Sequence, residues 1–312
     1  MAKTPVALVT GFLGSGKTTL ISRLLSHPEM GETAVIVNEL GEVAIDHHLV
    51  RRVDERTVVL RSGCVCCTLR GDLADELRDL LGRRERGEVP PFHRVVVETT
   101  GLADPAPIVY TLLSEAVVRH HYELETVVAT IDAVNGLEYE ESVKQAAIAD
   151  MLVVTKGDLA DPGPLLQRLQ RLNPAAEIVE ASFGDVEPDR LLRRPARDPR
   201  DVPTFEHGHG NGIHAVALFL EDQLDWTAFG IWLTMLLQAR GSDILRVKGL
   251  LNVGDGGPLL LNGVQHAVHP PEHLSAWPDD DRRSRLVFIG SGFSDEELTT
   301  SLAAFNRVAR TG

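Results

Sequence analysis

A glycine-rich segment near the start of the chain has the spacing of a phosphate-binding loop. Residues 11–18 are Gly-Phe-Leu-Gly-Ser-Gly-Lys-Thr and fit the pattern G-x-x-x-x-G-K-S/T. The glycines let several backbone N–H groups face one phosphate, and a helix that begins here adds the positive end of its dipole. We expect Lys17 to reach the β- and γ-phosphates of a nucleotide and the Thr18 hydroxyl to bind Mg²⁺. The other residues that we expect to contact the nucleotide here are Gly11, Gly14, Ser15, Gly16 and Thr19.

An acidic residue that follows a later apolar run is placed to support the same site. Residues 94–97 are Arg-Val-Val-Val, and Glu98-Thr99-Thr100-Gly101 come next. An acidic residue at the end of a buried strand can hold the Mg²⁺ shell, directly or through water, and this is the role we expect for Glu98. Gly101 can then offer its backbone N–H to the γ-phosphate. A helix cap or a turn is the alternative interpretation of this segment.

The segment Thr155-Lys156-Gly157-Asp158 is similar to the guanine-specificity loop of GTPases. The carboxylate of Asp158 would accept hydrogen bonds from guanine N1–H and the exocyclic amine, and the stem of Lys156 would cover the ring. Adenine lacks this pair of donors, so the segment favours GTP over ATP. Thr155 stands where Asn is commoner. In isolation these residues would indicate a surface turn, but here they directly follow an apolar run, residues 151–154.

All three cysteines of the chain, Cys64, Cys66 and Cys67, lie within four residues. Such a cluster indicates metal or redox chemistry, and soft thiolates suit Zn²⁺, Cu(I) and Co²⁺. Three thiols do not supply four ligands, so an open or exchangeable site is favoured over a closed structural one. Water, Glu39 or a histidine is the candidate fourth ligand. The alternative is a buried cluster of small apolar side chains, but two adjacent thiols do not easily face one core.

A second group of metal-ligating side chains lies further along the chain. His207, His209 and His214 are separated by three glycines, one asparagine and one isoleucine. Glycines would let these imidazoles turn toward one ion, and a flexible polar linker is an equal alternative.

The residue that would orient the attacking water is not visible after Gly101, where Leu102 and Ala103 follow. Glu42 and Asp46 are the candidates, and a solvated acidic loop is the alternative. Lys17 and Glu98 complete the set of candidate catalytic residues. Hydrolysis is therefore expected to be slow unless a client protein supplies a group.

Alternating apolar and helical runs predict a doubly wound, mostly parallel α/β domain around these loops. The phosphate loop then lies at a strand-to-helix junction, with a helical run at residues 19–25. The predicted strands are residues 6–9, 34–37, 57–60, 94–97, 127–131 and 151–154. Leucines at helical spacing predict helices through Leu69, Leu73, Leu77, Leu80 and Leu81, and through Leu165, Leu166, Leu169 and Leu172.

The character of the sequence changes after about Pro188. Residues 193–212 are rich in Arg, Asp, Pro, Gly and His and are expected to link residues 1–192 to a second domain, residues 213–312. This second domain is predicted to be α+β with an open sheet. Its expected strands are residues 213–219, 244–252, 259–264 and 285–289, and its expected helices are residues 226–239 and a last helix capped by Ser294-Asp295-Glu296-Glu297.

Composition narrows the class of protein. The 312 residues include 31 Lys and Arg against 45 Asp and Glu, a net charge of −14, which argues against a protein that binds duplex DNA. No apolar run approaches the ~20 residues of a membrane span, and no signal peptide is expected. Three clustered cysteines do not make a disulfide scaffold. We expect a cytoplasmic protein with neither nucleic-acid nor membrane partners.

Together these motifs resemble the CobW-like metallochaperone GTPases, which include cobalamin-associated proteins and activators of nitrile hydratase. The similarity extends over almost the whole chain. The matching segments of the first domain are residues 11–19, Asn38-Glu39-Leu40-Gly41-Glu42, Gly63-Cys64-Val65-Cys66-Cys67, residues 98–105 and residues 155–158. Those of the second domain are residues 245–249, 262–265 and 284–290.

The resemblance implies a GTPase that binds a transition metal at Cys64, Cys66 and Cys67 and couples its GTP state to metal delivery to a client protein. Zinc is the first choice of metal, with cobalt or iron as alternatives, and a nucleotide-dependent homodimer is compatible with the pattern. Some relatives carry an acidic residue where this chain has Val37, so a metal role does not carry over to that position. A metal-storage protein with a vestigial GTPase remains an alternative, as does a P-loop kinase with Cys66 and Cys67 in a lid; Asp158 after Lys156 opposes the kinase.

Overall fold

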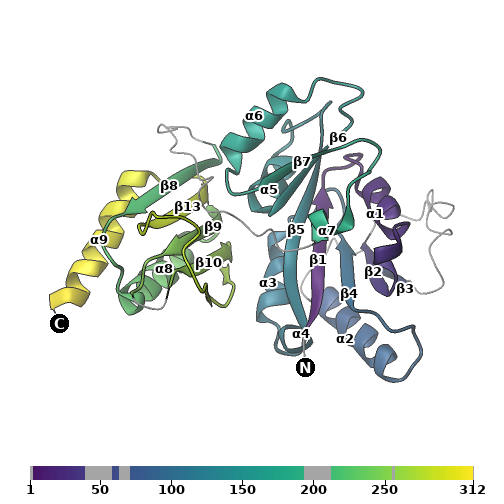
Figure 1. Ribbon diagram of the computed structural model, residues 1–312, viewed down its shortest axis with the longest axis horizontal. Coiled ribbons are helices and arrows are strands. Elements are labelled where there is room, and N and C mark those ends of the chain that lie inside the picture. The colour runs from purple at the N-terminus through teal and green to yellow at the C-terminus, as the bar shows by residue number, and fades with distance from the viewer. Residues whose placement is uncertain (1–2, 39–57, 63–70, 193–211, 255–256, 312) are drawn as a thin grey trace. The chain divides into compact units, whose positions relative to one another are not determined.

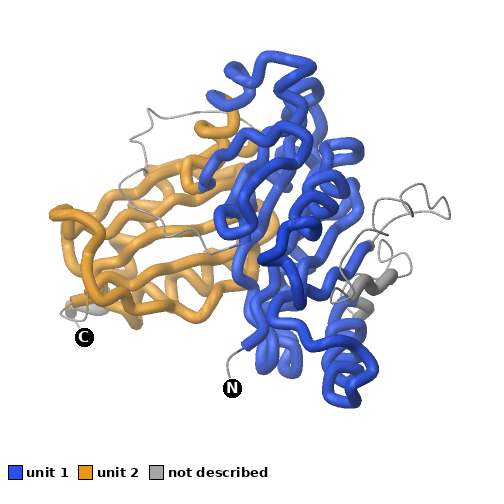
Figure 2. The backbone as a smooth tube through the Cα atoms, turned by 45° about the vertical axis from the view of Figure 1, so that its right-hand side comes forward, with its two compact units in different colours: residues 1–167, 176–196 blue, residues 168–175, 197–312 orange. Residues whose placement is uncertain are grey.

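The structure is a computed structural model that describes residues 3–38, 58–62, 71–192, 212–254 and 257–311. The chain divides into two compact units (Figure 2). Unit 1 comprises residues 1–167 and 176–196, and unit 2 comprises residues 168–175 and 197–312. Each unit has its own sheet and its own apolar core. Most of the expected linker lies outside the described residues, so the expected domain boundaries stay predictions.

Unit 1 is built on a seven-stranded sheet whose neighbouring strands are all parallel (Figure 1). The strand order is β3-β2-β4-β1-β5-β6-β7. The strands are β1 (Thr4–Gly11), β2 (Thr33–Asn38), β3 (Val58–Ser62), β4 (Arg94–Glu98), β5 (Tyr122–Asp132), β6 (Met151–Thr155) and β7 (Glu177–Ala181). Because parallel strands all end at one edge, the segments that follow them gather there. The predicted doubly wound α/β fold is confirmed.

Helices connect these strands in the described part of unit 1. They are α1 (Lys17–Leu25), the short 3₁₀ helix η1 (Pro28–Met30), α2 (Gly71–Glu85), α3 (Ala106–Ser114), α4 (Ala116–His121), α5 (Glu140–Ile148), α6 (Gly163–Leu172, which continues into unit 2) and α7 (Pro188–Leu192). Most leucines of the predicted faces are buried: Leu73, Leu77, Leu80 and Leu81 on α2, and Leu165, Leu169 and Leu172 on α6. Leu166 is half-buried, and Leu69 lies outside the described residues. Leu20 and Leu24 of α1 pack with Val9 of β1 and Val96 of β4 in one core cluster. This packing holds α1 against the sheet.

Two differences from the sequence prediction concern strands with exposed side chains. Strand β5 begins at Tyr122, five residues before the predicted start, because its first part alternates buried Leu124 with exposed Glu123 instead of forming an apolar run. Strand β7 was not predicted at all. It is an edge strand, and its sequence Glu-Ile-Val-Glu-Ala mixes charged and apolar residues. Continuous apolar runs therefore identify the interior strands and the edge strand β3, but miss β7, whose apolar residues alternate with charged ones.

Unit 2 is an antiparallel sheet covered by two helices. The strand order is β11-β10-β9-β13-β8, with β12 paired to β10. The strands are β8 (His214–Leu220), β9 (Ile244–Leu251), β10 (Leu259–Val264), β11 (Ala267–Val268), β12 (Glu272–His273) and β13 (Ser284–Gly290), and the helices are α8 (Trp226–Arg240) and α9 (Asp295–Thr311). One core cluster joins Phe229 of α8 and Leu302 of α9 to Leu261 and Phe288 of the sheet. The predicted α+β class is confirmed.

The start of α9 confirms the predicted capping box. The backbone N–H of Ser294 donates to Glu297 Oε2 at 3.1 Å, and the backbone N–H of Glu297 donates to Ser294 Oγ at 3.2 Å. The two bonds satisfy N–H groups that the first helical turn leaves without partners. None of the helices within the described ranges has both the length and the apolar character needed to cross a membrane.

Candidate nucleotide-binding site

The phosphate loop curls between the end of β1 and the first residue of α1. Gly11 has a φ of +145°, and a Cβ atom there would lie 2.2 Å from Thr130 Oγ1 and 2.6 Å from Ser15 Oγ. Only glycine fits this position, both for its backbone angle and for its lack of space. The curl is closed by a bond from the Ser15 backbone N–H to the Phe12 carbonyl at 3.1 Å.

The ammonium group of Lys17 lies inside this curl. Its Nζ donates to the carbonyl oxygen of Gly11 at 2.7 Å and to that of Phe12 at 3.1 Å. The side chain is buried, with 8% of its surface exposed. The positive charge of Lys17 is thus held within a loop whose glycines leave the backbone N–H groups accessible. This arrangement favours the binding of a phosphate group.

Two oxygen ligands from distant parts of the sequence meet beside the loop. Thr18, in the first turn of α1, donates its hydroxyl to Glu98 Oε1 at 3.0 Å. Glu98 is the last residue of β4, pairs in register with Val9 of β1 and is 2% exposed. A hydroxyl and a carboxylate are hard oxygen ligands of the kind that Mg²⁺ takes, so the pair fits this ion. The structure brings together the two residues that the sequence assigned to magnesium.

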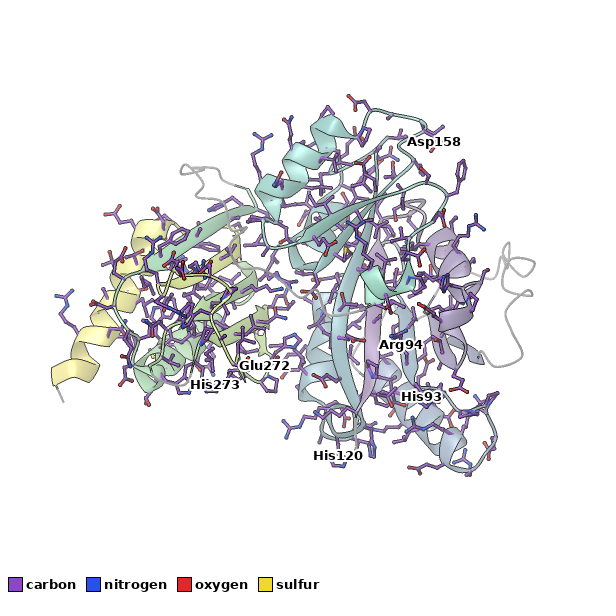
Figure 3. All side chains as sticks on the ribbon, viewed as in Figure 1. His93, Arg94, His120, Asp158, Glu272 and His273 are labelled. Atoms are coloured by element: carbon purple, nitrogen blue, oxygen red, sulfur yellow. The ribbon has the colours of Figure 1, made fainter. Side chains whose placement is uncertain are left out.

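The expected guanine loop is joined to the phosphate loop by hydrogen bonds. Thr155 donates its hydroxyl to the carbonyl of Ser15 at 2.8 Å, and Ser15 Oγ lies 2.6 Å from Thr130 Oγ1. Ends of β5 and β6 are therefore held to the loop after β1. Asp158 is exposed at the same edge of the sheet, where a base could reach its carboxylate (Figure 3).

The side chains of Asp132 and Tyr139 also support this edge, and the sequence alone does not identify either of them. Lys156 has a φ of +58°, and its Nζ lies 3.8 Å from Oδ2 of the buried Asp132, which holds the lysine stem next to the base loop. The rings of Phe12 and Tyr139 stack with centroids 4.2 Å apart. Neither Asp132 nor Tyr139 belongs to a local motif, so only the fold brings them to the site.

The segment after β4 runs against the phosphate loop. The backbone N–H of Thr99 donates to Val9 O at 3.0 Å, and its hydroxyl donates to Thr10 Oγ1 at 2.9 Å. A Cβ atom at Gly101 would lie 2.5 Å from the backbone nitrogen of Leu13. Gly101 therefore has to be glycine for this close approach. The predicted γ-phosphate contact of Gly101 is compatible with this placement and stays a prediction.

The predicted transition-metal ligands and water-orienting residues lie outside the described residues. They are Glu39, Glu42, Asp46, Cys64, Cys66 and Cys67, and His207 and His209 also fall there. Within the described ranges there is no group of three or more His, Cys, Asp or Glu side chains that could hold a metal. The structure does describe the two strand ends that precede the cysteine segment and the acidic segment: Asn38 of β2 pairs in register with Ser62 of β3.

His214, the described member of the histidine tract, has both ring nitrogens near carbonyl oxygens. Nδ1 lies 2.9 Å from Gly212 O, and Nε2 lies 3.1 Å from Phe293 O. In this arrangement both ring nitrogens are directed at backbone carbonyl oxygens.

A curled glycine loop at a strand end, a lysine inside it and a threonine–carboxylate pair beside it define a P-loop nucleotide-binding protein. Residues 5–180 match the nucleotide-binding domain of CobW/HypB/UreG, and residues 213–306 match the C-terminal domain of the cobalamin synthesis protein CobW. The chain belongs to this CobW/HypB/UreG family of P-loop GTPases, as its motifs predicted.

Several relatives are similar over most of their length. The zinc chaperone YjiA of Escherichia coli is 33% identical, and the alignment covers 97% of this chain and 98% of the relative. The zinc-regulated GTPase metalloprotein activator 1 of Schizosaccharomyces pombe is 31% identical, with 92% of this chain and 82% of the relative covered. The crystal structure of Zn(II)-bound YjiA GTPase from E. coli matches with a TM-score of 0.77 at 29% identity, over 98% of this chain and 99% of that one.

Proposed function

We propose that the chain is a GTP-dependent metallochaperone that binds a transition metal, zinc in the first place, and couples GTP hydrolysis to metal delivery. The register of Asn38 with Ser62 carries this proposal, because β2 and β3 then end side by side at the edge that holds the phosphate loop. The segments with Glu39 and with the three cysteines follow directly after these two strand ends in the sequence. Relatives named as zinc chaperones in E. coli and Pseudomonas aeruginosa support zinc.

The proposed metal ligands are Cys64, Cys66 and Cys67, with Glu39 as the fourth. Thiolates favour zinc over harder ions, and one carboxylate leaves the site able to exchange its metal. Thiolate ligation requires loss of a proton from each cysteine, so zinc affinity should rise with pH.

The proposed nucleotide chemistry uses the contacts described above. Lys17 neutralises charge on the β- and γ-phosphates, Gly101 donates to the γ-phosphate, and Asp158 selects guanine. Thr18 and Glu98 hold Mg²⁺, which neutralises part of the charge that develops on the phosphates. Glu42 and Asp46 are the proposed water-orienting residues. Since neither is a glutamine of the usual kind, turnover is expected to be slow without the client.

The two sites are proposed to be linked through the segments at the shared edge of the sheet. Such segments order when a γ-phosphate is present and relax after hydrolysis. Zinc should therefore bind more tightly with GTP than with GDP, by about 5- to 150-fold, the usual range for coupled sites. By reciprocity, zinc must increase the affinity for an uncleaved GTP analogue by the same factor.

Competitive zinc titration against a chromophoric chelator tests this proposal. The wild-type chain, Cys66→Ser and Cys67→Ser are each titrated with Mg²⁺ and either an uncleaved GTP analogue or GDP. The wild type should bind zinc more tightly with the analogue, and both serine variants should lose most of their affinity. His214→Ala is the control and should behave as the wild type, because both nitrogens of His214 already face carbonyl oxygens.

Two outcomes would contradict the proposal. Equal zinc affinity in the two nucleotide states would favour a storage protein with a vestigial GTPase. Retained affinity in the serine variants, together with a loss in His214→Ala, would place the metal at the histidine tract instead. The client protein that receives the metal and a nucleotide-dependent homodimer are further parts of the proposal, and sedimentation of the GTP-analogue form against the GDP form tests the dimer.

A further inference from the structure

A fully buried glutamine holds the segment that follows β4. Gln145 lies on α5 and is 0% exposed. Its Nε2 donates to the carbonyl oxygens of Gly101 and of Ala103, each at 3.1 Å. Backbone carbonyls can only accept, so the two bonds determine which end of the amide faces this segment. Both N–H donors of the side chain are used on residues more than forty positions away.

The oxygen of the same amide has no hydrogen-bond partner among the described residues. This atom, Oε1 of Gln145, is buried. A buried acceptor without a donor destabilises the folded state, so a glutamine is a poor choice here for stability alone. The two bonds to Gly101 and Ala103 are thus its distinguishing contribution, and local features that cost stability cluster at functional sites.

The held segment is fixed from both sides. On the N-terminal side of Gly101, Thr99 donates through its backbone N–H to Val9 and through its hydroxyl to Thr10. On the C-terminal side, Gln145 binds the carbonyl oxygens of Gly101 and of Ala103. Gly101 lies between these anchors and against Leu13 of the phosphate loop, with no space for a Cβ atom. The orientation of the Gly101 peptides therefore depends on the anchors around it.

Helix α5 is well placed to act as a rigid support. Ala146, Ala147 and Ile148, which follow Gln145, are each at most 1% exposed. The chain then enters β6, which ends at Thr155 of the expected guanine loop. Gln145 thereby links the segment that carries Gly101 to the helix that leads into β6 and the expected guanine loop.

We infer that Gln145 is a positioning residue for GTP recognition: it holds the Gly101–Ala103 segment so that the Gly101 N–H meets the γ-phosphate. Gln145 does not touch the nucleotide in this role. Its effect should fall on ligands that carry a γ-phosphate and spare those that lack one. The inference rests on the proposed nucleotide site and adds to it the residue that makes the site sensitive to the third phosphate.

The test compares nucleotide affinities and turnover in the full chain. Gln145→Met keeps the length and unbranched shape of the side chain, removes both donors and also removes the unpaired buried oxygen, so it should fold. Gln145→Glu keeps the shape and places a carboxyl oxygen where the donors were. Gln170→Leu, at an exposed glutamine on α6, is the matched control. Affinities for GDP and for an uncleaved GTP analogue are measured by calorimetry, and kcat and KM for GTP are measured separately.

Both Gln145 variants should bind the GTP analogue about tenfold more weakly, from the loss of two hydrogen bonds that orient the segment, with GDP affinity changed less than about twofold. Their kcat should fall by at least about tenfold, and the control should match the wild type. Equal losses for GDP and the GTP analogue, or no loss for either, would overturn the inference and leave Gln145 a purely structural residue. A wild-type chain that binds neither nucleotide would instead overturn the proposed nucleotide site, and the inference with it.

Discussion

The two units of the chain use buried polar side chains in different ways. In unit 1 such residues collect at the carboxyl edge of a parallel sheet, where Ser15, Lys17, Glu98 and Thr130 are all buried. In unit 2 the sheet is antiparallel, and a buried arginine, Arg285, pairs with Asp279 at 2.7 Å. Parallel strands all end at one edge, whereas antiparallel strands end at both. Topology therefore explains why the ligand-binding motifs concentrate in unit 1.

A cavity in the core of unit 2 should have the largest effect and should spare nucleotide binding. Leu261 is 0% exposed and packs in the core of unit 2, so Leu261→Ala should destabilise that unit by about 2–5 kcal/mol. All three tryptophans, Trp226, Trp232 and Trp277, belong to unit 2, so tryptophan fluorescence during urea unfolding reports on this unit alone. Leu260→Ala, at the half-buried neighbour, is the milder control.

Loss of the lysine in the phosphate loop should weaken nucleotide binding and leave the stability of unit 2 unchanged. Lys17→Ala should weaken GTP binding by at least about a hundredfold, because charge-assisted hydrogen bonds contribute about 1.5–3 kcal/mol each. Calorimetry measures the affinity, and the tryptophan unfolding curve should not move. Lys144→Ala, which removes a half-buried lysine paired with Glu140 on α5, is the matched control. Unchanged GTP affinity in Lys17→Ala would contradict the assignment of the phosphate loop.

A change at the base loop should alter specificity more than affinity. Asp158→Asn should shift the preference from guanine toward xanthine, which has a carbonyl where guanine has its amine and can accept from the asparagine. Competition between GTP and XTP should show a reversal of about tenfold or more, the size of one buried hydrogen-bond exchange. Asp161→Asn, in the following turn, should leave the preference as it is. Full retention of GTP affinity in Asp158→Asn would mean that another residue reads the base.

The smallest expected effect concerns acid sensitivity of unit 2. Hydrogen bonds from Arg283 lower the pKa of Asp281 to about 2, and the Arg285 guanidinium lowers the pKa of Asp279. Because both values lie below the ordinary carboxyl pKa, this stabilisation is complete above about pH 4 and is lost as the pH falls toward 2. Asp281→Asn should move the acid midpoint of tryptophan fluorescence by less than about one pH unit. An unchanged midpoint would show that the Arg283 pair does not contribute to acid resistance.

The sequence predicted those parts of the fold and site that have local patterns. Interior strands appear as apolar runs, and the phosphate loop has fixed spacing, so the sequence alone identifies Lys17, Thr18 and Glu98. It does not identify Gln145, because this residue lies more than forty positions from the carbonyls that it binds and its own helix has no motif. The register of β2 with β3 also depends on pairing between distant segments and has no signature in either strand.

The strand order has a consequence for the way the chain is made. The neighbours of β1 are β4 and β5, and β5 ends at Asp132, 121 residues after β1 ends at Gly11. At synthesis rates of about 5–20 residues per second, an apolar strand waits about 6 to 24 seconds for its second partner. Strands β2 and β3, by contrast, are both complete at Ser62 and are the earliest pair in the sheet that can form. The phosphate loop thus acquires its supporting strands late, and until then β1 is an exposed aggregation-prone segment on the ribosome.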